Sequence, residues 1–153
     1  MTAVGEQAPD VTTRNQHGET VVLSELLARG DGGVLLVFYP WAFSGICTGE
    51  LAALRDGHAG LAEAGVRVLA VSCDAMFTLR AFAEAQDLPF DLLTDHWPHG
   101  AIARAYGVFD DEAGCALRGT FLVDRSGTVV WHVLNGIGEP RDVVEHLQVA
   151  LAG

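Results

Sequence analysis

Cys47 lies in the stretch Pro40-Trp41-Ala42-Phe43-Ser44-Gly45-Ile46-Cys47-Thr48-Gly49-Glu50, directly after an apolar run at 34–39. The apolar run is typical of a buried strand. Leucines at positions 51, 54 and 61 then recur at helical spacing, so we expect a helix after the strand. Ser44 is a preferred N-cap residue, which predicts that Cys47 lies in the first turn of this helix.

This position gives Cys47 two possible roles. Counting back along the leucine stripe in steps of three and four places its sulfur on the inward face of the helix. Unpaired backbone N–H groups and the positive helix end favour the nucleophilic thiolate there. The alternative is a small buried hydrophobe, which is the usual role of a free cysteine. The position of Cys47 between a strand and a helix leaves both roles open.

The composition limits the class of protein. With 153 residues, half of them hydrophobic and 19% charged, the chain is predicted to form one globular domain, 1–153. A formal charge of −11 with only nine basic residues argues against nucleic acid or an anionic membrane as partner. No apolar run approaches the roughly 20 residues of a membrane span. A basic segment followed by an apolar one is also missing at the N-terminus, so we expect a cytoplasmic protein.

The other cysteines and the histidines show no familiar spacing. Cys73 and Cys115 bring the cysteine count to three, and no pair is spaced as Cys-x-x-Cys. This count disfavours both a disulfide scaffold and a dithiol site. His96 and His99 form the only histidine pair near a ligand spacing, and a zinc site would need further ligands, so no metal is predicted. We expect Cys73, which follows a valine-rich run, to be a buried structural thiol.

The remaining elements follow from periodicity and turn signals. We expect a hairpin within 11–23, strands at 34–39, 66–72 and 90–94, helices at 76–86 and 98–106, a second hairpin within 117–134, and a last helix after Asp142-x-x-Glu145. The strand–helix–strand order around Cys47 predicts a right-handed crossover between parallel neighbours. These elements make one α/β domain with a central mixed sheet flanked by helices and with an N-terminal β-hairpin.

Two segments resemble a known family. Pro40-x-x-x-Ser44-x-x-Cys47 is similar to the active-site signature of peroxiredoxins, and Arg118-Gly119-Thr120-Phe121-Leu122-Val123-Asp124-Arg125-Ser126-Gly127 resembles their second segment. Pro9-Asp10 and Trp97-Pro98-His99-Gly100 extend the similarity over nearly the whole chain. The chain looks most like the one-cysteine, alkyl hydroperoxide reductase E (AhpE) type of actinobacteria. The resemblance implies a thioredoxin-like fold.

The resemblance also implies a reaction, the reduction of a hydroperoxide without a cofactor. Cys47 would attack one peroxide oxygen and become a sulfenic acid. Ser44, Arg118 and the backbone N–H groups around Gly45 and Ile46 would donate to the oxygens as negative charge develops on them. Other roles stay open from the residues alone, since Ser44 could be only a helix cap and Arg118 half of a surface ion pair.

Further site residues follow from the same resemblance. Pro40 would keep water from the thiolate, although it could simply end a strand, and Glu50 would orient a basic residue. Trp41, Phe43 and Trp97 would form an apolar entrance that favours organic or fatty-acid hydroperoxides over hydrogen peroxide. These aromatic residues could equally belong to the core or to a dimer interface. On family grounds we expect a homodimer.

The second half of the catalytic cycle is open at this point. The default is an external thiol, and the resemblance suggests a mycothiol-like thiol with a mycoredoxin- or thioredoxin-like reductant. Cys115, predicted to lie in a loop three residues before Arg118, is a possible internal resolving cysteine. Position 52 is Ala52 and the C-terminal tail has no cysteine, so neither common resolving arrangement is present.

Two other functions use the same thiol. A cysteine hydrolase or thiol transferase needs a base beside Cys47, and the nearest histidine in sequence, His58, lies three helical turns away. A non-catalytic peroxide sensor or chaperone-like binding protein is the remaining alternative. Neither of them explains Arg118 and Pro40.

Overall fold

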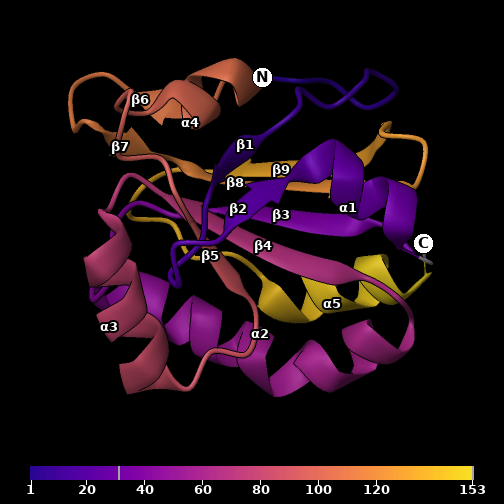
Figure 1. Ribbon diagram of the computed structural model, residues 1–153, viewed down its shortest axis with the longest axis horizontal. Helices are drawn as coiled ribbons and strands as arrows, with labels where there is room; N and C mark the ends of the chain where they lie inside the picture. The colour runs from indigo at the N-terminus through magenta and orange to yellow at the C-terminus, as the bar shows by residue number, and fades with distance from the viewer. Residues whose placement is uncertain (31, 153) are drawn as a thin grey trace.

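A five-stranded sheet forms the centre of the molecule, as the computed structural model of residues 1–30 and 32–152 shows (Figure 1). Its strand order is β5-β4-β3-β8-β9, with bounds Asp91–Thr94, Arg67–Ser72, Val34–Phe38, Arg118–Val123 and Val129–Asn135. The three strands β3, β4 and β5 run parallel, whereas β8 and β9 are antiparallel to their neighbours. The prediction of a mixed sheet with parallel strands around the Cys47 helix is confirmed.

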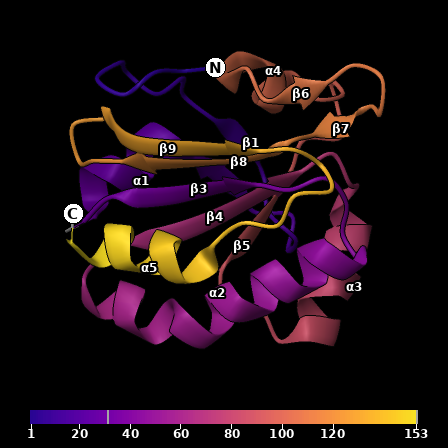
Figure 2. The ribbon, with the colours of Figure 1, turned by 180° about the vertical axis from the view of Figure 1, so that it is seen from behind.

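Helices cover both faces of this sheet. The helices α2 (Gly45–Glu63), α3 (Met76–Gln86) and α5 (Val143–Ala152) lie on one face, and α1 (Leu23–Arg29) and α4 (Ala101–Tyr106) on the other (Figures 1 and 2). Alternate side chains of β3 serve the two layers: Leu35 and Val37 pack with α2, and Leu36 and Phe38 pack with α1 and α4. Burial on both faces explains why the run at 34–39 is apolar throughout.

Two small strand pairs complete the fold. The predicted N-terminal hairpin is present as β1 (Thr12–Arg14) and β2 (Thr20–Val22), and Thr13 Oγ1 donates to the Thr94 carbonyl at 2.6 Å, which joins the hairpin to β5. A second pair, β6 (Phe109–Asp110) with β7 (Cys115–Ala116), was not predicted. Each of these strands is too short to leave a periodic pattern in the sequence.

Two local predictions need correction. The helix expected at 98–106 begins at Ala101, because Gly100 has a left-handed φ of 72° that a helix cannot include. Asp95 then accepts hydrogen bonds from the second and third helical N–H groups, those of Ile102 and Ala103, both at 2.9 Å. Cys115 lies in strand β7 and not in a loop.

None of the helices in residues 1–30 and 32–152 has the length and apolar character that a membrane-spanning helix requires.

Candidate active site

Cys47 is fixed by the junction between β3 and α2. The strand ends at Phe38, Ser44 occupies the N-cap with extended backbone angles, and the helix opens at Gly45. The Thr48 N–H donates to the Ser44 carbonyl at 2.9 Å, which is the first hydrogen bond of the helix. Cys47 is 0% exposed and packs with the leucines of α2 against β3. The predicted inward direction of the sulfur is therefore confirmed.

Arg118 brings a positive charge to this sulfur. It is the first residue of β8, only 2% exposed, and its Nη1 donates to Cys47 Sγ at 3.3 Å. Its Nε donates to the Ile137 carbonyl at 2.7 Å, which fixes the plane of the guanidinium. This contact places a buried cation directly against the sulfur that the sequence predicts to be the nucleophile. The structure thus brings together two residues that lie 71 positions apart.

Glu50 holds this arginine and a second one. It lies one turn beyond Cys47 and is 5% exposed. Glu50 Oε1 accepts from Arg118 Nη1 at 2.5 Å and from Arg141 Nη1 at 3.3 Å, while Oε2 accepts from the Arg141 backbone N–H at 2.7 Å. Both carboxylate oxygens are thereby occupied by the protein. Glu50 is therefore placed to orient Arg118 and Arg141.

Arg141 is the residue of this site that sequence reasoning missed. Its side chain is 0% exposed, and its Nη2 donates to the carbonyls of Phe38 and Gly119. Burial, together with the nearby charge of Arg118, lowers the pKa of Arg141 to about 10, so it stays protonated at neutral pH. Arginines are mostly exposed, so composition gives no signal for this one. The only hint is its place directly before the capping box of α5, where Asp142 Oδ1 accepts from the Glu145 N–H.

Ser44 has the predicted place but a different bond. The Ser44 hydroxyl donates to the Trp41 carbonyl at 2.9 Å, and it does not cap a helix N–H group, which corrects that part of the prediction. A hydroxyl has one hydrogen and two lone pairs. Because its hydrogen is used by Trp41, the Ser44 oxygen is left to accept from a donor on a bound molecule, whereas the sequence-based expectation was that Ser44 donates to the peroxide.

The surface beside Cys47 is apolar. Trp41 is 38% exposed, Phe43 53% and Ile46 37%, and Gly45 is exposed as well, whereas Pro40 is buried after the end of β3. The Phe43 ring packs against Phe82 of α3 with their centroids 5.0 Å apart. Of the three aromatic residues predicted for the entrance, Trp41 and Phe43 thus belong to the exposed corner and not to the core.

The other two cysteines are poorly suited to react as thiolates. Cys73 is 2% exposed, and burial raises its pKa to about 12, in line with the predicted structural role. Cys115 is 0% exposed; burial raises its pKa, and the negative charges of Asp110 and Cys47 add to this shift. All three cysteines are free thiols.

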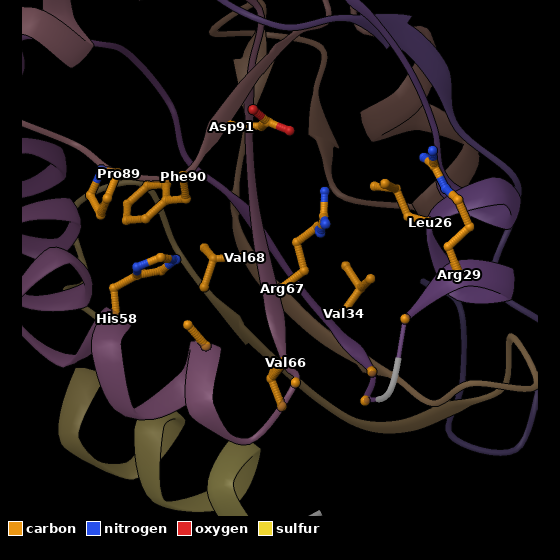
Figure 3. A pocket seen from close by; sticks show the side chains of 15 residues that line it. Leu26, Arg29, Val34, His58, Val66, Arg67, Val68, Pro89, Phe90 and Asp91 are labelled. Carbon is orange, nitrogen blue, oxygen red and sulfur yellow. The ribbon is translucent and has the colours of Figure 1, made fainter.

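A half-open pocket lies away from this site. It has a volume of about 460 Å³ and is lined by Arg29, Arg67, His58 and Phe90, among others (Figure 3). Val34, the first residue of β3, also lines it, whereas Cys47 follows the last residue of that strand. The pocket therefore opens at the opposite end of the sheet from Cys47.

Comparisons with known proteins find relatives named alkyl hydroperoxide reductase and peroxiredoxin. Alkyl hydroperoxide reductase E of Mycobacterium tuberculosis (strain ATCC 25618 / H37Rv) is 46% identical over 142 residues, which are 93% of this chain and 92% of that protein. Peroxiredoxin Bcp of Bacillus subtilis (strain 168) is 34% identical over 133 residues, or 83% of this chain and 82% of that protein.

Solved structures give the same result. The crystal structure of peroxidoxin BcpB from Mycobacterium tuberculosis superposes with a TM-score of 0.86 at 27% identity, covering 99% of this chain and 97% of that one. Enterococcus faecalis AhpC superposes with a TM-score of 0.88 at 26% identity, covering 99% of this chain and 92% of that one. These neighbours confirm the predicted thioredoxin-like peroxiredoxin fold. The model of the AhpC/TSA family matches residues 4–132, and the chain belongs to this family of peroxiredoxins.

Proposed function

We propose that this protein is a thiol-dependent peroxidase that reduces hydroperoxides through Cys47. The observation that carries the proposal is the buried Arg118 guanidinium 3.3 Å from Cys47 Sγ. It pairs a nucleophile with a fixed cation. The relatives named alkyl hydroperoxide reductase and peroxiredoxin support the same reaction.

The reaction conserves atoms and charge in one displacement. The Cys47 thiolate attacks the terminal peroxide oxygen, an S–O bond forms, and the O–O bond breaks. Cys47 retains the attacked oxygen, with its hydrogen, as a sulfenic acid, and the departing oxygen takes a proton from the solvent to become an alcohol or water. Negative charge moves along the S–O–O line during this step, so Arg118 and the N–H groups at Gly45 and Ile46 stabilise the transition state.

Rapid-mixing kinetics test the proposal. We expect wild-type Cys47 to be oxidised by an organic hydroperoxide far faster than free cysteine, and Cys47→Ser to be inactive. Arg118→Gln should lower the rate by about 100-fold, the usual effect of removing one charge-stabilising donor. Arg104→Gln, which removes an exposed ion pair with Asp111 and a cation–π contact with Phe109, is the control and should leave the rate unchanged. A wild-type rate equal to that of free cysteine would overturn the proposal and favour a non-catalytic sensor.

For the return half of the cycle we propose an external thiol. Cys73 and Cys115 are buried with raised pKa values, which makes each a weak attacking nucleophile. A mycothiol-like thiol with a mycoredoxin- or thioredoxin-like reductant fits a sulfenic acid that has no efficient partner in its own chain. Turnover should therefore require such a thiol and should persist in the double variant Cys73→Ala, Cys115→Ala.

The apolar corner supports a preference for organic substrates. Trp41, Phe43 and Ile46 expose apolar surface beside Cys47, which suits the chain of a fatty-acid hydroperoxide better than hydrogen peroxide. The second-order rate constant of Cys47 oxidation by a fatty-acid hydroperoxide, divided by the rate constant for hydrogen peroxide, measures this preference. Phe43→Ser should lower the ratio, and an unchanged ratio would argue against a role of this surface.

We also propose a cytoplasmic homodimer. Trp97 is 85% exposed, and contact with a second copy of the chain would remove its large apolar ring from water. Three free cysteines, and a cycle that depends on thiol reductants, suit the reducing cytoplasm.

A further inference from the structure

The turn that carries Ser44 holds a strained backbone. Between the end of β3 and the start of α2, Phe43 has a left-handed φ of 69°. Residues other than glycine avoid this region, and where they adopt it the surrounding structure must hold them there. Within the turn, the Ser44 N–H and hydroxyl both donate to the Trp41 carbonyl, at 3.4 and 2.9 Å.

One carboxylate anchors this turn from outside. Asp74 Oδ2 accepts from the Ala42 N–H at 2.8 Å. Among the hydrogen bonds of residues 1–30 and 32–152, the other bonds of positions 40–44 stay within the turn or go to α2. The bond to Asp74 is the only one that joins these positions to a distant part of the chain. Asp74 follows β4 and precedes α3, and α3 also supplies Phe82, on which the Phe43 ring rests.

Asp74 is itself fixed on two sides. Ser72 Oγ donates to the same Oδ2 atom at 2.7 Å, and the Asp74 carbonyl accepts from Thr94 Oγ1 at 2.6 Å. These bonds come from the ends of β4 and β5, so the position of the carboxylate is set by the sheet.

A single peptide group connects Asp74 to Ser44. The Ala42 N–H and the Trp41 C=O belong to the same planar peptide, in which they point in opposite directions. Asp74 holds the N–H side, and Ser44 donates to the C=O side. Turning this peptide over would aim a carbonyl oxygen at a carboxylate, which repels it. Asp74 therefore fixes the direction in which the Ser44 hydroxyl donates, and so which lone pairs it presents beside Cys47.

We propose that Asp74 is a positioning residue for peroxide reduction, acting through the Trp41–Ala42 peptide on Ser44. The proposal rests on the proposed function of Cys47. With its hydrogen directed at Trp41, the Ser44 oxygen accepts the O–H of the hydroperoxide and aligns the O–O bond with the sulfur. Without Asp74 the peptide is free to reorient, and the Ser44 hydroxyl loses this fixed direction.

Three variants at position 74 separate acceptor position from charge. Asp74→Asn keeps an oxygen at the Oδ2 position but loses the charge, whereas Asp74→Glu keeps the charge but displaces the oxygen. Asp74→Ala loses both. We expect the rate of Cys47 oxidation by the hydroperoxide to lie within about 3-fold of the wild-type rate in Asp74→Asn. In Asp74→Glu and Asp74→Ala the rate should be about 10- to 100-fold lower, which is the cost of a misplaced catalytic group. Asp111→Ala, a remote exposed carboxylate, controls for the change in net charge.

The same variants in a Ser44→Ala background give the decisive test. If Asp74 acts through Ser44, Asp74→Ala has no further effect once the hydroxyl is gone. The rate of the double variant Ser44→Ala, Asp74→Ala should then agree with the rate of Ser44→Ala within about 3-fold. If the two losses multiply, or if Glu is fast while Asn is slow, the proposal is wrong. Circular dichroism checks folding, and if Ala does not fold, the comparison of Glu with Asn decides. A slow wild type would overturn the proposed function and this role with it; a fast wild type with an unimpaired Ala variant would overturn only the role of Asp74.

Discussion

At the scale of single residues, the site is a buried set of charges in which one carboxylate forms ion pairs with two arginines. Glu50 lies between Arg118 and Arg141, and all three side chains are at most 4% exposed. Buried ion pairs give little net stability, but removing one member leaves the others unpaired in a medium of low dielectric constant. We therefore interpret the network as a device that fixes Arg118 beside Cys47.

Removal of the Glu50 charge tests this interpretation. Glu50→Gln should lower the free energy of unfolding by about 3 kcal/mol, because two buried guanidinium groups lose their counter-charge. Cys47 oxidation should slow by about 10-fold or more, because Arg118 is no longer held in place. Denaturant unfolding and rapid mixing measure the two effects. Asp56→Asn is the control: its pair with Arg55 is exposed, and its loss should change stability by less than about 0.5 kcal/mol. Equal effects of the two substitutions would contradict the role of Glu50.

At the scale of elements, α5 is joined to the sheet by a buried histidine behind this network. His146 is 2% exposed; its Nδ1 lies 2.6 Å from the Asp142 carbonyl and its Nε2 lies 3.0 Å from Thr120 Oγ1. A carbonyl only accepts, so Nδ1 donates to it; in the neutral ring, Nε2 then accepts from the Thr120 hydroxyl. Burial, with a contribution from the charge of Arg141, lowers the pKa of His146 below its ordinary value of 6.5.

This pKa shift predicts a pH dependence of stability. In the unfolded chain His146 takes up a proton near pH 6.5, whereas the folded protein resists protonation until a lower pH. Since the unfolded state binds more protons in this window, the free energy of unfolding should fall as the pH drops through 6.5. It should level off below the folded pKa. His146→Gln should remove this part of the pH dependence in thermal unfolding, and an unchanged profile would contradict the assignment.

The end of α3 offers a prediction about the backbone. Asp87 is the C-cap of α3 with a left-handed φ of 53°, and it places a negative charge at the negative end of the helix. Asp87→Gly should therefore stabilise the protein by about 1 kcal/mol, since glycine accepts this φ freely and carries no charge. Asp87→Ala removes the same charge but keeps the strain, so the denaturation midpoint should rise less for Ala than for Gly. The opposite order would contradict the backbone argument.

At the scale of the whole molecule, sequence patterns predicted most of the fold and part of the site. Periodicity located the central strands and helices, with α3 predicted to the residue, because those elements bury a continuous face. Arg141, Asp74 and the direction of the Ser44 hydroxyl could not be predicted in this way. Each depends on contacts between segments that are distant in the sequence, such as Ala42 with Asp74, and a local pattern carries no signal for them.

The proposed homodimer also belongs to this scale. Trp97→Asp should place a charge in the proposed interface and shift the protein from dimer to monomer in sedimentation experiments. Phe77→Asp is the matched control, because Phe77 is also an exposed aromatic residue, at 69%, on α3. A wild type that sediments as a monomer, or a dimer that Trp97→Asp leaves intact, would contradict the assignment of this surface.

The most direct test of the central claim is mass spectrometry after one equivalent of a fatty-acid hydroperoxide, with a sulfenic-acid trap present. Wild type, Cys115→Ala and Arg118→Gln should be compared at the same short reaction time. The account predicts a single trapped sulfenic acid on Cys47 in wild type and in Cys115→Ala, and little trapped product in Arg118→Gln. A trapped acid on Cys73 or Cys115, or equal trapping with and without Arg118, would contradict it. A Cys47–Cys115 disulfide in wild type would overturn the one-cysteine cycle.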